Sequence, residues 1–289
     1  MTTTADQLEV DESETATKRS TTGLRYELKQ CRHGLFLFNL QNIYIGRSLS
    51  VYGEYSEHEL QALMRLVKPG AWIVEAGSNI GADTVPLARH IGRKGRLLAF
   101  EPQRLVHQML CANLALNGIF NVAARWMACG TGPGELVVPQ LDYTKPANFG
   151  GISLKESGPG ERIPVVAIDS FDLPRCDLIK ADVEGMELAV LQGSIETIRR
   201  HWPRLYIENN GQGDSPALIE FLMQLGYKLY WHLPPLFNDD NFAKDVANIY
   251  GDIVSSNIIG TGPQDKPVRS LRPVTGPDDV GLQIHAKNR

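Results

Sequence analysis

The feature that most constrains the fold of this chain is an alternation of short apolar runs with longer amphipathic segments across its central part. The apolar runs are rich in Val, Ile and Leu, as is typical of strands buried on both faces. Seven strands are predicted, within AWIVEAG, GRLLAFEP, NVAARWMACG, CDLIKADVEG, RLYIENN, YKLYWHL and DIVSSNIIGT. Because strands that alternate with helices form βαβ units, we predict an α/β, Rossmann-like protein with a mostly parallel seven-stranded sheet flanked by helices.

The sequence on either side of this alternation has a different character. The predicted divisions are a disordered N-terminal tail (1–22), a β-hairpin with a capped helix (23–68), the α/β domain (69–261) and a C-terminal tail or arm (262–289). The first tail is rich in Thr, Ser and charge, so it cannot bury enough apolar surface to offset the entropy of ordering. In the second division two strands are expected within residues 34–46, and Ser56 with Glu59 predicts a capping box at a helix start.

Composition excludes several classes of protein. The net charge is −4 and the isoelectric point about 6.0, so the chain has no broad electrostatic attraction for nucleic acid. No run approaches the roughly 18 apolar residues of a membrane span, and the polar N-terminus lacks the apolar core of a signal peptide. The four cysteines are scattered without the spacing of metal ligands. We therefore expect a soluble, cytoplasmic protein that binds no nucleic acid.

A glycine-containing loop, Glu75-Ala-Gly77-Ser-Asn79-Ile-Gly81, follows the first strand of the alternation. Its glycines permit a tight turn and a close approach of backbone to a ligand. The loop differs from the dinucleotide pattern GxGxxG, because Asn79 replaces the middle glycine and the carboxylate of Glu75 precedes the first one. That carboxylate would repel the pyrophosphate of NAD. It can attract the sulfonium and ammonium groups of S-adenosylmethionine, whose own carboxylate can bind the loop backbone.

The next strand ends in Phe100-Glu101-Pro102. An acid at this position typically accepts hydrogen bonds from the ribose hydroxyls of a nucleotide. The alternative is a solvated carboxylate that is favoured by the dipole of the helix beginning there. The loop and the acid together, in a βαβ unit, indicate a nucleotide-type ligand more specifically than the loop alone.

Five segments resemble successive motifs of the FkbM-type methyltransferases: VEAGSNIG, FEPQ, DLIKADVEGMELAVLQG, LYIENNG and SSNIIG. The resemblance extends over roughly residues 34–260 and is most specific in the segment that contains Lys180, Asp182 and Glu184. It implies the class I methyltransferase fold, S-adenosylmethionine as cofactor, and methylation of hydroxyl groups of sugars, glycolipids or natural products. The family often has Asp at position 75 and Ala at position 78, and neither departure removes the chemistry.

The resemblance also implies a cofactor site, with Met127 and Ala128 near the adenine. The predicted cofactor-binding residues are Glu75, Gly77, Ser78, Asn79, Gly81, Glu101, Pro102, Met127, Ala128 and Asp182.

Methyl transfer to a hydroxyl requires that the acceptor oxygen be aligned with the methyl group and lose a proton. Asp182 follows the fourth strand, and Glu208 with Asn209 follows the fifth, so these side chains are expected at one edge of the sheet. Two interpretations remain open. Asp182, Glu208 and Asn209 could bind Mg²⁺, which would lower the pKa of the acceptor hydroxyl. Alternatively, Asp182 acts as a general base without metal. Glu184 is expected to cap the following helix.

Two other titratable residues require an assignment. His232 follows the sixth strand and is a candidate base near neutral pH, with a structural role as the alternative. The predicted catalytic residues are thus Asp182, Glu208 and His232. Lys180 lies within an apolar strand, so it is expected to pair with a carboxylate, either Glu208 or Asp182.

The leading interpretation is an S-adenosylmethionine-dependent O-methyltransferase that acts on a small-molecule or glycan acceptor. The alternatives are an N- or protein-directed methyltransferase, or a catalytically inactive binding protein with the same fold. The loop argues against an NAD-dependent oxidoreductase. The hairpin and the C-terminal arm are candidate surfaces for a homo-oligomer.

Overall fold

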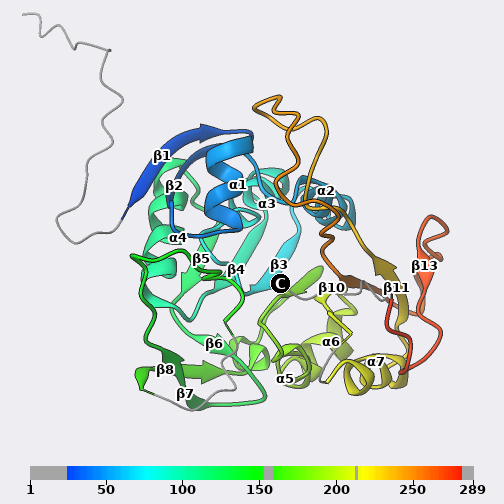
Figure 1. Cartoon of the computed structure of the whole chain (residues 1–289). Coiled ribbons are helices and arrows are strands. Elements are labelled where there is room, and N and C mark those ends of the chain that lie inside the picture. The colour runs from blue at the N-terminus through cyan, green and yellow to red at the C-terminus, as the bar shows by residue number, and fades with distance from the viewer. Residues whose placement is uncertain (1–24, 153–158, 212–213, 282–289) are drawn as a thin grey trace, which may run out of the picture.

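The computed structural model describes residues 25–152, 159–211 and 214–281, so the tail predicted at 1–22 lies outside the described residues. Its central sheet has the strand order β13-β11-β12-β10-β9-β3-β4-β5 (Figure 1). The strands are β3 (Trp72–Ala76), β4 (Arg96–Phe100), β5 (Val122–Arg125), β9 (Leu178–Ala181), β10 (Arg204–Glu208), β11 (Lys228–His232), β12 (Asn257–Thr261) and β13 (Arg272–Pro273).

The predicted fold class is confirmed. The strands β5, β4, β3, β9 and β10 pair in parallel, and β12 is antiparallel to both of its neighbours. The two-residue β13 adds an eighth strand beyond the seven that were expected. The chain runs outward from β3 to β5 and then returns to β9 on the other side of β3, which creates a switch point between β3 and β9.

Helices cover both faces of the sheet, because successive strand residues point to opposite faces and both sets are apolar. Along β3, Ile73 packs into one buried cluster and Val74 into another. The first cluster includes residues of α2, α3 and α4, and the second includes residues of α5, α6 and α7 (Figure 1). These helices are α2 (Glu57–Leu66), α3 (Thr84–Ile91), α4 (Arg104–Leu116), α5 (Glu187–Gln192), α6 (Ile195–His201) and α7 (Ser215–Gln224).

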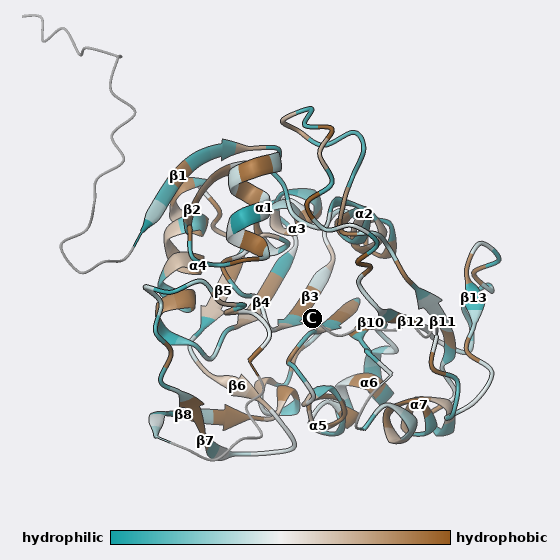
Figure 2. Ribbon diagram, viewed as in Figure 1, coloured by the Kyte–Doolittle hydropathy of each residue, from teal (hydrophilic) through white to brown (hydrophobic). Residues whose placement is uncertain are grey.

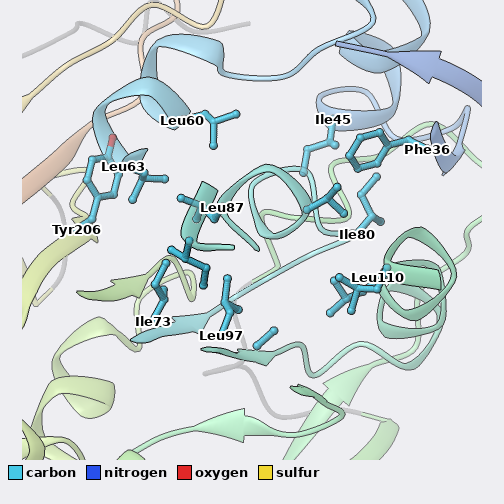
Figure 3. Close-up of a cluster of buried hydrophobic side chains, with 14 of the residues drawn as sticks. Phe36, Ile45, Leu60, Leu63, Ile73, Ile80, Leu87, Leu97, Leu110 and Tyr206 are labelled. Atoms are coloured by element: carbon cyan, nitrogen blue, oxygen red, sulfur yellow. The ribbon is translucent and has the colours of Figure 1, made fainter. Parts of the chain in front are cut away.

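Figure 3 shows the first cluster. Leu63 of α2, Leu87 of α3 and Leu110 of α4 are fully buried, and they lie around Ile73 and Leu97 of the sheet. Burial of one such side chain contributes about 1.5–3 kcal/mol, so this layer is a main source of the stability of the first face.

The N-terminal hairpin pairs β1 (Tyr26–Cys31) with β2 (Gly34–Asn39). Two strands were predicted within residues 34–46. The prediction of the second one is wrong, because residues from Ile45 onward form α1 (Ile45–Tyr52). Ile45, Leu49 and Tyr52 are buried along one face of this helix, a helical spacing that the short apolar run concealed. The outer strand β1 is largely hydrophilic in Figure 2.

Two asparagine side chains hold β2: Asn113 of α4 and Asn117, the residue directly after this helix. The Asn113 side chain accepts from the N–H of Leu37 at 2.7 Å and donates to the carbonyl of Leu37 at 3.1 Å. Asn117 makes the same pair of bonds with Leu35, at 3.1 and 2.7 Å. The amide side chains therefore replace a neighbouring strand along this edge.

The capping box predicted before α2 is not formed. Ser56 precedes the helix with a φ of 44°, and its Oγ donates to the Glu59 carboxylate at 3.1 Å instead of accepting from a helix N–H. Glu59 is buried, so its carboxylate is directed into the molecule.

A second sheet, with the order β6-β8-β7, was not predicted. It consists of β6 (Ala128–Cys129), β7 (Gly134–Pro139) and β8 (Gly160–Val166), and the short 3₁₀ helix η1 (Ile168–Phe171) follows it. The segment expected as one third strand is therefore divided between two sheets, as β5 and β6. The connection that leaves β7 reaches the hairpin region, where Ala147 exchanges backbone hydrogen bonds with Gln41 and Ile43.

The described part of the C-terminal arm packs on the edge of the central sheet. There β13 pairs with β11, and Arg272 lies over the ring of Trp231 at 5.8 Å from its centroid. In the described ranges no helix is both long enough and apolar enough to span a membrane.

Candidate functional site

A cavity of about 230 Å³ opens at the carboxyl ends of β3, β4, β9 and β10, beside the switch point. Eight of the residues predicted for cofactor binding line it: Gly77, Ser78, Asn79, Glu101, Pro102, Met127, Ala128 and Asp182. Glu208 lines it as well. The topology thus brings together residues that lie more than 130 positions apart.

The loop after β3 is held by its own hydrogen bonds. The N–H groups of Gly77 and Ser78 donate to the carbonyl of Phe100, at 3.0 and 2.9 Å, and that of Asn79 donates to Glu101 Oε2 at 3.0 Å. The N–H groups of Ile80 and Gly81 also have acceptors within the loop. The loop backbone therefore does not offer the free donors that we expected for the cofactor carboxylate.

The residue types of this loop follow from its backbone. Asn79 has a φ of 48°, a left-handed conformation that Asn tolerates better than most residues. At Gly77 a Cβ would lie 1.8 Å from the carbonyl oxygen of Asp182, and at Gly81 one would lie 2.8 Å from Leu110 Cδ1. These two glycines permit close packing against β9 and α4, and Gly81 does not line the cavity.

Glu101 is fixed in the wall of the cavity. Its two carboxylate oxygens accept from the N–H groups of Asn79, at 3.0 Å, and Gln103, at 2.8 Å. Burial raises its pKa to about 7, and the two backbone donors oppose that rise. Each oxygen keeps a second lone pair, so the side chain can still accept from a ligand hydroxyl.

Glu75 lies behind the loop and not in the cavity wall. It is fully buried, and Thr84 Oγ1 donates to its Oε2 at 2.6 Å. Its Oε1 has no hydrogen-bond partner. Burial raises its pKa to about 7, opposed by the charge of Lys180. The structure therefore places Glu75 against Thr84 and within the field of Lys180, outside the lining of the cavity.

Lys180 of β9 is the cation at the centre of the site. Its Nζ lies 3.3 Å from Asp83 Oδ2 and 3.6 Å from Asp182 Oδ2, and the residue is 3% exposed. Of the two partners predicted from the sequence, the ion pair is with Asp182. Asp83, directly before α3, is a further partner that the sequence did not indicate. The surrounding carboxylates raise the pKa of Lys180 against the effect of burial, so it is a charged, structural lysine.

Three carboxyl groups gather beside it. Oxygen atoms of Asp182, Glu184 and Glu208 lie within 4.8 Å of one another. Burial, and then the charges of Asp182 and Glu184, raise the pKa of Glu208 well above its usual range, and it shares a hydrogen bond with Asp182. These surroundings therefore favour the protonated form of Glu208.

The composition of this cluster differs from the predicted metal site. The Asn209 Oδ1 atom accepts from the N–H of Gly211 at 2.9 Å, and Asn209 does not line the cavity. Glu184 is in its place. The capping role expected of Glu184 is not observed, because the N-cap residue of α5 is Met186, without a side-chain cap hydrogen bond. Glu187 accepts from the N–H groups of Val183 and Gly185 in the turn before the helix, both at 3.1 Å. Glu184 has a φ of 52°, a left-handed backbone conformation, and it lines the cavity with Asp182 and Glu208.

His232 does not line the cavity. Its Nδ1 lies 2.8 Å from the hydroxyl oxygen of Tyr206, and burial lowers its pKa. This geometry corresponds to the structural alternative.

Residues outside the predicted set complete the cavity. On one side they come from α1, α2 and the segment before β12: Tyr44, Ile45, Tyr55, Glu59, Leu236, Val254 and Ser255. On the other side they are Asn148, Gly150, Gly151 and Ile152 of the connection after β7. Burial, and next the charge of Asp83, raise the pKa of Glu59 to about 7. None of these follows a parallel strand, so the rule that located Glu101 and Asp182 could not find them.

The fold and the polar cavity at its switch point define a class I methyltransferase domain. Residues 75–229, more than half of the chain, match the model of the FkbM methyltransferase domain, and the chain belongs to this family. It is 30% identical over 166 residues to methyltransferase sdnD of Sordaria araneosa, a match that covers 45% of this chain and 62% of that protein. The match thus spans less than two thirds of the length of that relative.

A solved structure of an FkbM methyltransferase from Methylobacillus flagellatus is similar to 67% of this chain and to 44% of its own. The sequence identity is 20% and the TM-score 0.45.

Proposed function

We propose that this protein is an S-adenosylmethionine-dependent O-methyltransferase that acts on a hydroxyl group of a sugar, glycolipid or natural product. The observation that carries the proposal is the arrangement of two acidic features in one cavity. Glu101 lies in one part of the wall, and the hydrogen-bonded pair of Asp182 and Glu208 lies in another. The first feature can bind the ribose hydroxyls of a nucleoside. The second can orient an acceptor hydroxyl and take its proton.

The residues present fit S-adenosylmethionine. Glu101 has lone pairs for the ribose hydroxyls, and Met127 and Ala128 offer a largely apolar wall for the adenine. Asp83 lines the cavity, and its buried Oδ1 has no hydrogen-bond partner, so it can accept from the ammonium group. When bound, the cofactor supplies an activated methyl group on its sulfonium.

The protein's contribution to the transfer is to position the acceptor oxygen and receive its proton. Asp182 Oδ2 lies 3.6 Å from Nζ of the charged Lys180, and Asp182 also shares a hydrogen bond with Glu208. An acceptor hydroxyl that enters between these two groups, in place of their direct hydrogen bond, can donate to the carboxylate of Asp182 and accept from the protonated Glu208. Such a contact fixes the orientation of the hydroxyl and leaves a base next to its proton.

A divalent cation is a separate proposal for the same cluster. Three carboxylate oxygens within 4.8 Å of one another suit a hard ion such as Mg²⁺, with Glu184 in the place expected for Asn209. If the reaction requires the ion, EDTA abolishes turnover and Mg²⁺ restores it. Unchanged turnover in EDTA excludes this role.

Calorimetric titration with S-adenosylmethionine, and in parallel with NAD⁺, tests the cofactor. We expect binding of the first and none of the second. Glu101→Ala should weaken it by about 1–3 kcal/mol, the cost of losing hydrogen bonds to a charged group. Because Glu101 also holds the loop, each variant is checked by thermal unfolding. Glu54→Ala is the matched control, since Glu54 is a buried acid bonded to Arg32, away from the cavity.

A well-folded protein that binds no S-adenosylmethionine contradicts the proposal. It would favour the inactive binding protein with this fold. Methyl transfer to an amine rather than a hydroxyl would retain the cofactor assignment and overturn the acceptor class.

A further inference from the structure

A second cavity, of about 280 Å³, adjoins the candidate active site. Glu184 and Glu208 line both cavities, so these two carboxyl groups form the wall between them. The second cavity lies where α5 and α7 begin, and Leu188 and Leu218 give it an apolar part. Of the residues predicted for the site, Glu208 lines both cavities, and Asn209 lines only the second one.

Two polar side chains in this wall have no hydrogen-bond partner. Asn209 and Ser215 are 4% and 5% exposed, and both line the second cavity. Within the described ranges, the buried atoms Asn209 Nδ2 and Ser215 Oγ have no hydrogen-bond partner. Because nearly all buried polar atoms in native proteins are paired, these two atoms point to a ligand that pairs with them.

The chemistry of the missing partner follows from Asn209. Its Oδ1 already accepts from the N–H of Gly211 at 2.9 Å, which fixes the orientation of the amide. Its backbone is fixed as well, by hydrogen bonds with Ser256 at 2.8 and 2.7 Å. The unpaired group is therefore the NH₂ donor, and its partner must offer an acceptor oxygen. A bare cation cannot supply one.

The carboxyl groups of the wall restrict the ligand further. Glu184, Glu187 and Glu208 all line this cavity, and among the described residues none of the three forms an ion pair with Lys, Arg or His. An anionic ligand would be repelled here. A neutral hydroxyl both donates to a carboxylate and accepts from an amide, so it meets both requirements.

We propose that the second cavity binds a neutral, polyhydroxylated ring of the methyl acceptor, such as an uncharged sugar. Its C–H face packs on Leu188 and Leu218, its hydroxyls bond Asn209 and Ser215, and one hydroxyl reaches the Asp182–Glu208 pair across the shared wall. This inference rests on the proposed function and adds to it a subsite, two recognition residues and the exclusion of phosphorylated or carboxylated sugars at that subsite.

The test measures sugar binding and cofactor binding separately on the full chain. Methyl glucoside and methyl galactoside, each paired with its 6-phosphate, are titrated by saturation-transfer NMR, and S-adenosylmethionine is titrated by calorimetry. We expect the neutral glycosides to bind at least about tenfold more tightly than the phosphates, because like charges repel. Ser215→Ala and Asn209→Asp should each weaken glycoside binding about three- to tenfold, with cofactor binding unchanged.

The unfolding midpoint separates this role from a structural one. Removing the Ser215 hydroxyl, which has no hydrogen-bond partner among the described residues, should leave the midpoint unchanged or raise it. Ser194→Ala is the matched control, because the buried Ser194 Oγ donates to the carbonyl of Val190 at 2.6 Å and lines neither cavity. It should lower the midpoint without changing glycoside binding.

Each outcome decides between the two proposals. Cofactor binding without glycoside binding, or glycoside binding that is equal in Ser215→Ala, overturns the subsite and leaves the methyltransferase standing. Glycoside binding that depends on Ser215, without cofactor binding, supports the subsite and overturns the proposed function. Binding of Mg²⁺ that is lost in Ser215→Ala, with no glycoside bound, assigns the cavity to a cation instead.

Discussion

Asp182 lies between two groups of carboxylates that differ in one respect, the presence of a buried cation. On one side, Lys180 lies within 3.6 Å of both Asp83 and Asp182, and its charge also acts on the buried Glu75. The charges on this side are compensated inside the protein. Their arrangement is complete without a ligand, apart from one unpartnered oxygen on Glu75 and one on Asp83.

On the other side, Glu184 and Glu208 have no such cation among the ion pairs of the described ranges. Neighbouring carboxylates raise the pKa of both groups in addition to burial. Protonation of Glu208 therefore reduces the negative charge of this group, as the ion pairs with Lys180 do for the first group. The comparison teaches that one group is built to maintain the fold and its charge, whereas the other can exchange protons with a substrate.

The largest expected effect is the loss of the cation. Lys180→Met would leave Asp83, Asp182 and Glu75 without their common partner, so the free energy of unfolding should fall by about 3–5 kcal/mol. Urea unfolding followed by circular dichroism measures it. Lys244→Met is the control, because Lys244 pairs with Asp240 at the surface and its removal should change nothing measurable.

A second substitution sharpens this result. Glu75→Gln in the Lys180→Met background removes one of the stranded carboxylates and should recover part of the lost stability. If the double variant is as unstable as the single one, the charge compensation assigned to Lys180 is wrong.

The next effect is on catalysis. Glu208→Gln keeps a neutral donor beside Asp182 but removes the carboxyl group that shares a proton with Asp182, so the proton that Asp182 takes from the acceptor can no longer be passed on. Methyl transfer should fall about 10²- to 10⁴-fold, the range of general acid–base catalysis, while the affinity for S-adenosylmethionine and the unfolding midpoint stay within error. Single-turnover rates with a radiolabelled methyl donor measure it. Equal rates in Glu208→Gln and the wild type would remove Glu208 from the mechanism.

Much of the fold could be predicted because it depends on local periodicity. The runs that became β3, β4 and β9 are buried on both faces, and their continuous apolar character is visible without any tertiary information. Where the periodic segment was short, the prediction from periodicity failed. The apolar residues around Ile45 were compatible with a strand, and only their packing against the hairpin shows that they belong to a helix.

The site could be predicted in part for a similar reason. Glu101 and Asp182 directly follow parallel strands and Glu208 is the last residue of one, and the carboxyl ends of these strands meet at one edge. The directions of the side chains could not be predicted, so Asn209 was expected where Glu184 is found. Glu59 was also missed, because it reaches the cavity from a helix that precedes the sheet, and only tertiary packing places it there.

The smallest expected effect is on the pH dependence of the unfolding free energy. It is compared between Glu75 of the first group and Glu184 of the second. The pKa of Glu75 and that of Glu184 are both raised to about 7. A carboxyl whose pKa is raised by folding binds its proton more tightly in the native state. The stability that it contributes is complete below the unfolded pKa, about 4.3, and is lost as the pH rises to about 7.

Glu75→Gln should therefore flatten the fall in unfolding free energy between these pH values by about 1–3 kcal/mol, and Glu184→Gln by less, because Glu184 is less buried. Salt distinguishes the causes. Burial is the largest cause of both shifts. The contribution of the fully buried Glu75 should be the same in about 0.05 and about 0.5 M NaCl, whereas the further part that Asp182 and Glu187 impose on the less buried Glu184 is screened. Unfolding at both salt concentrations across this pH range measures the difference. An equal response of the two variants to salt would mean that the two sides of Asp182 are not electrostatically distinct.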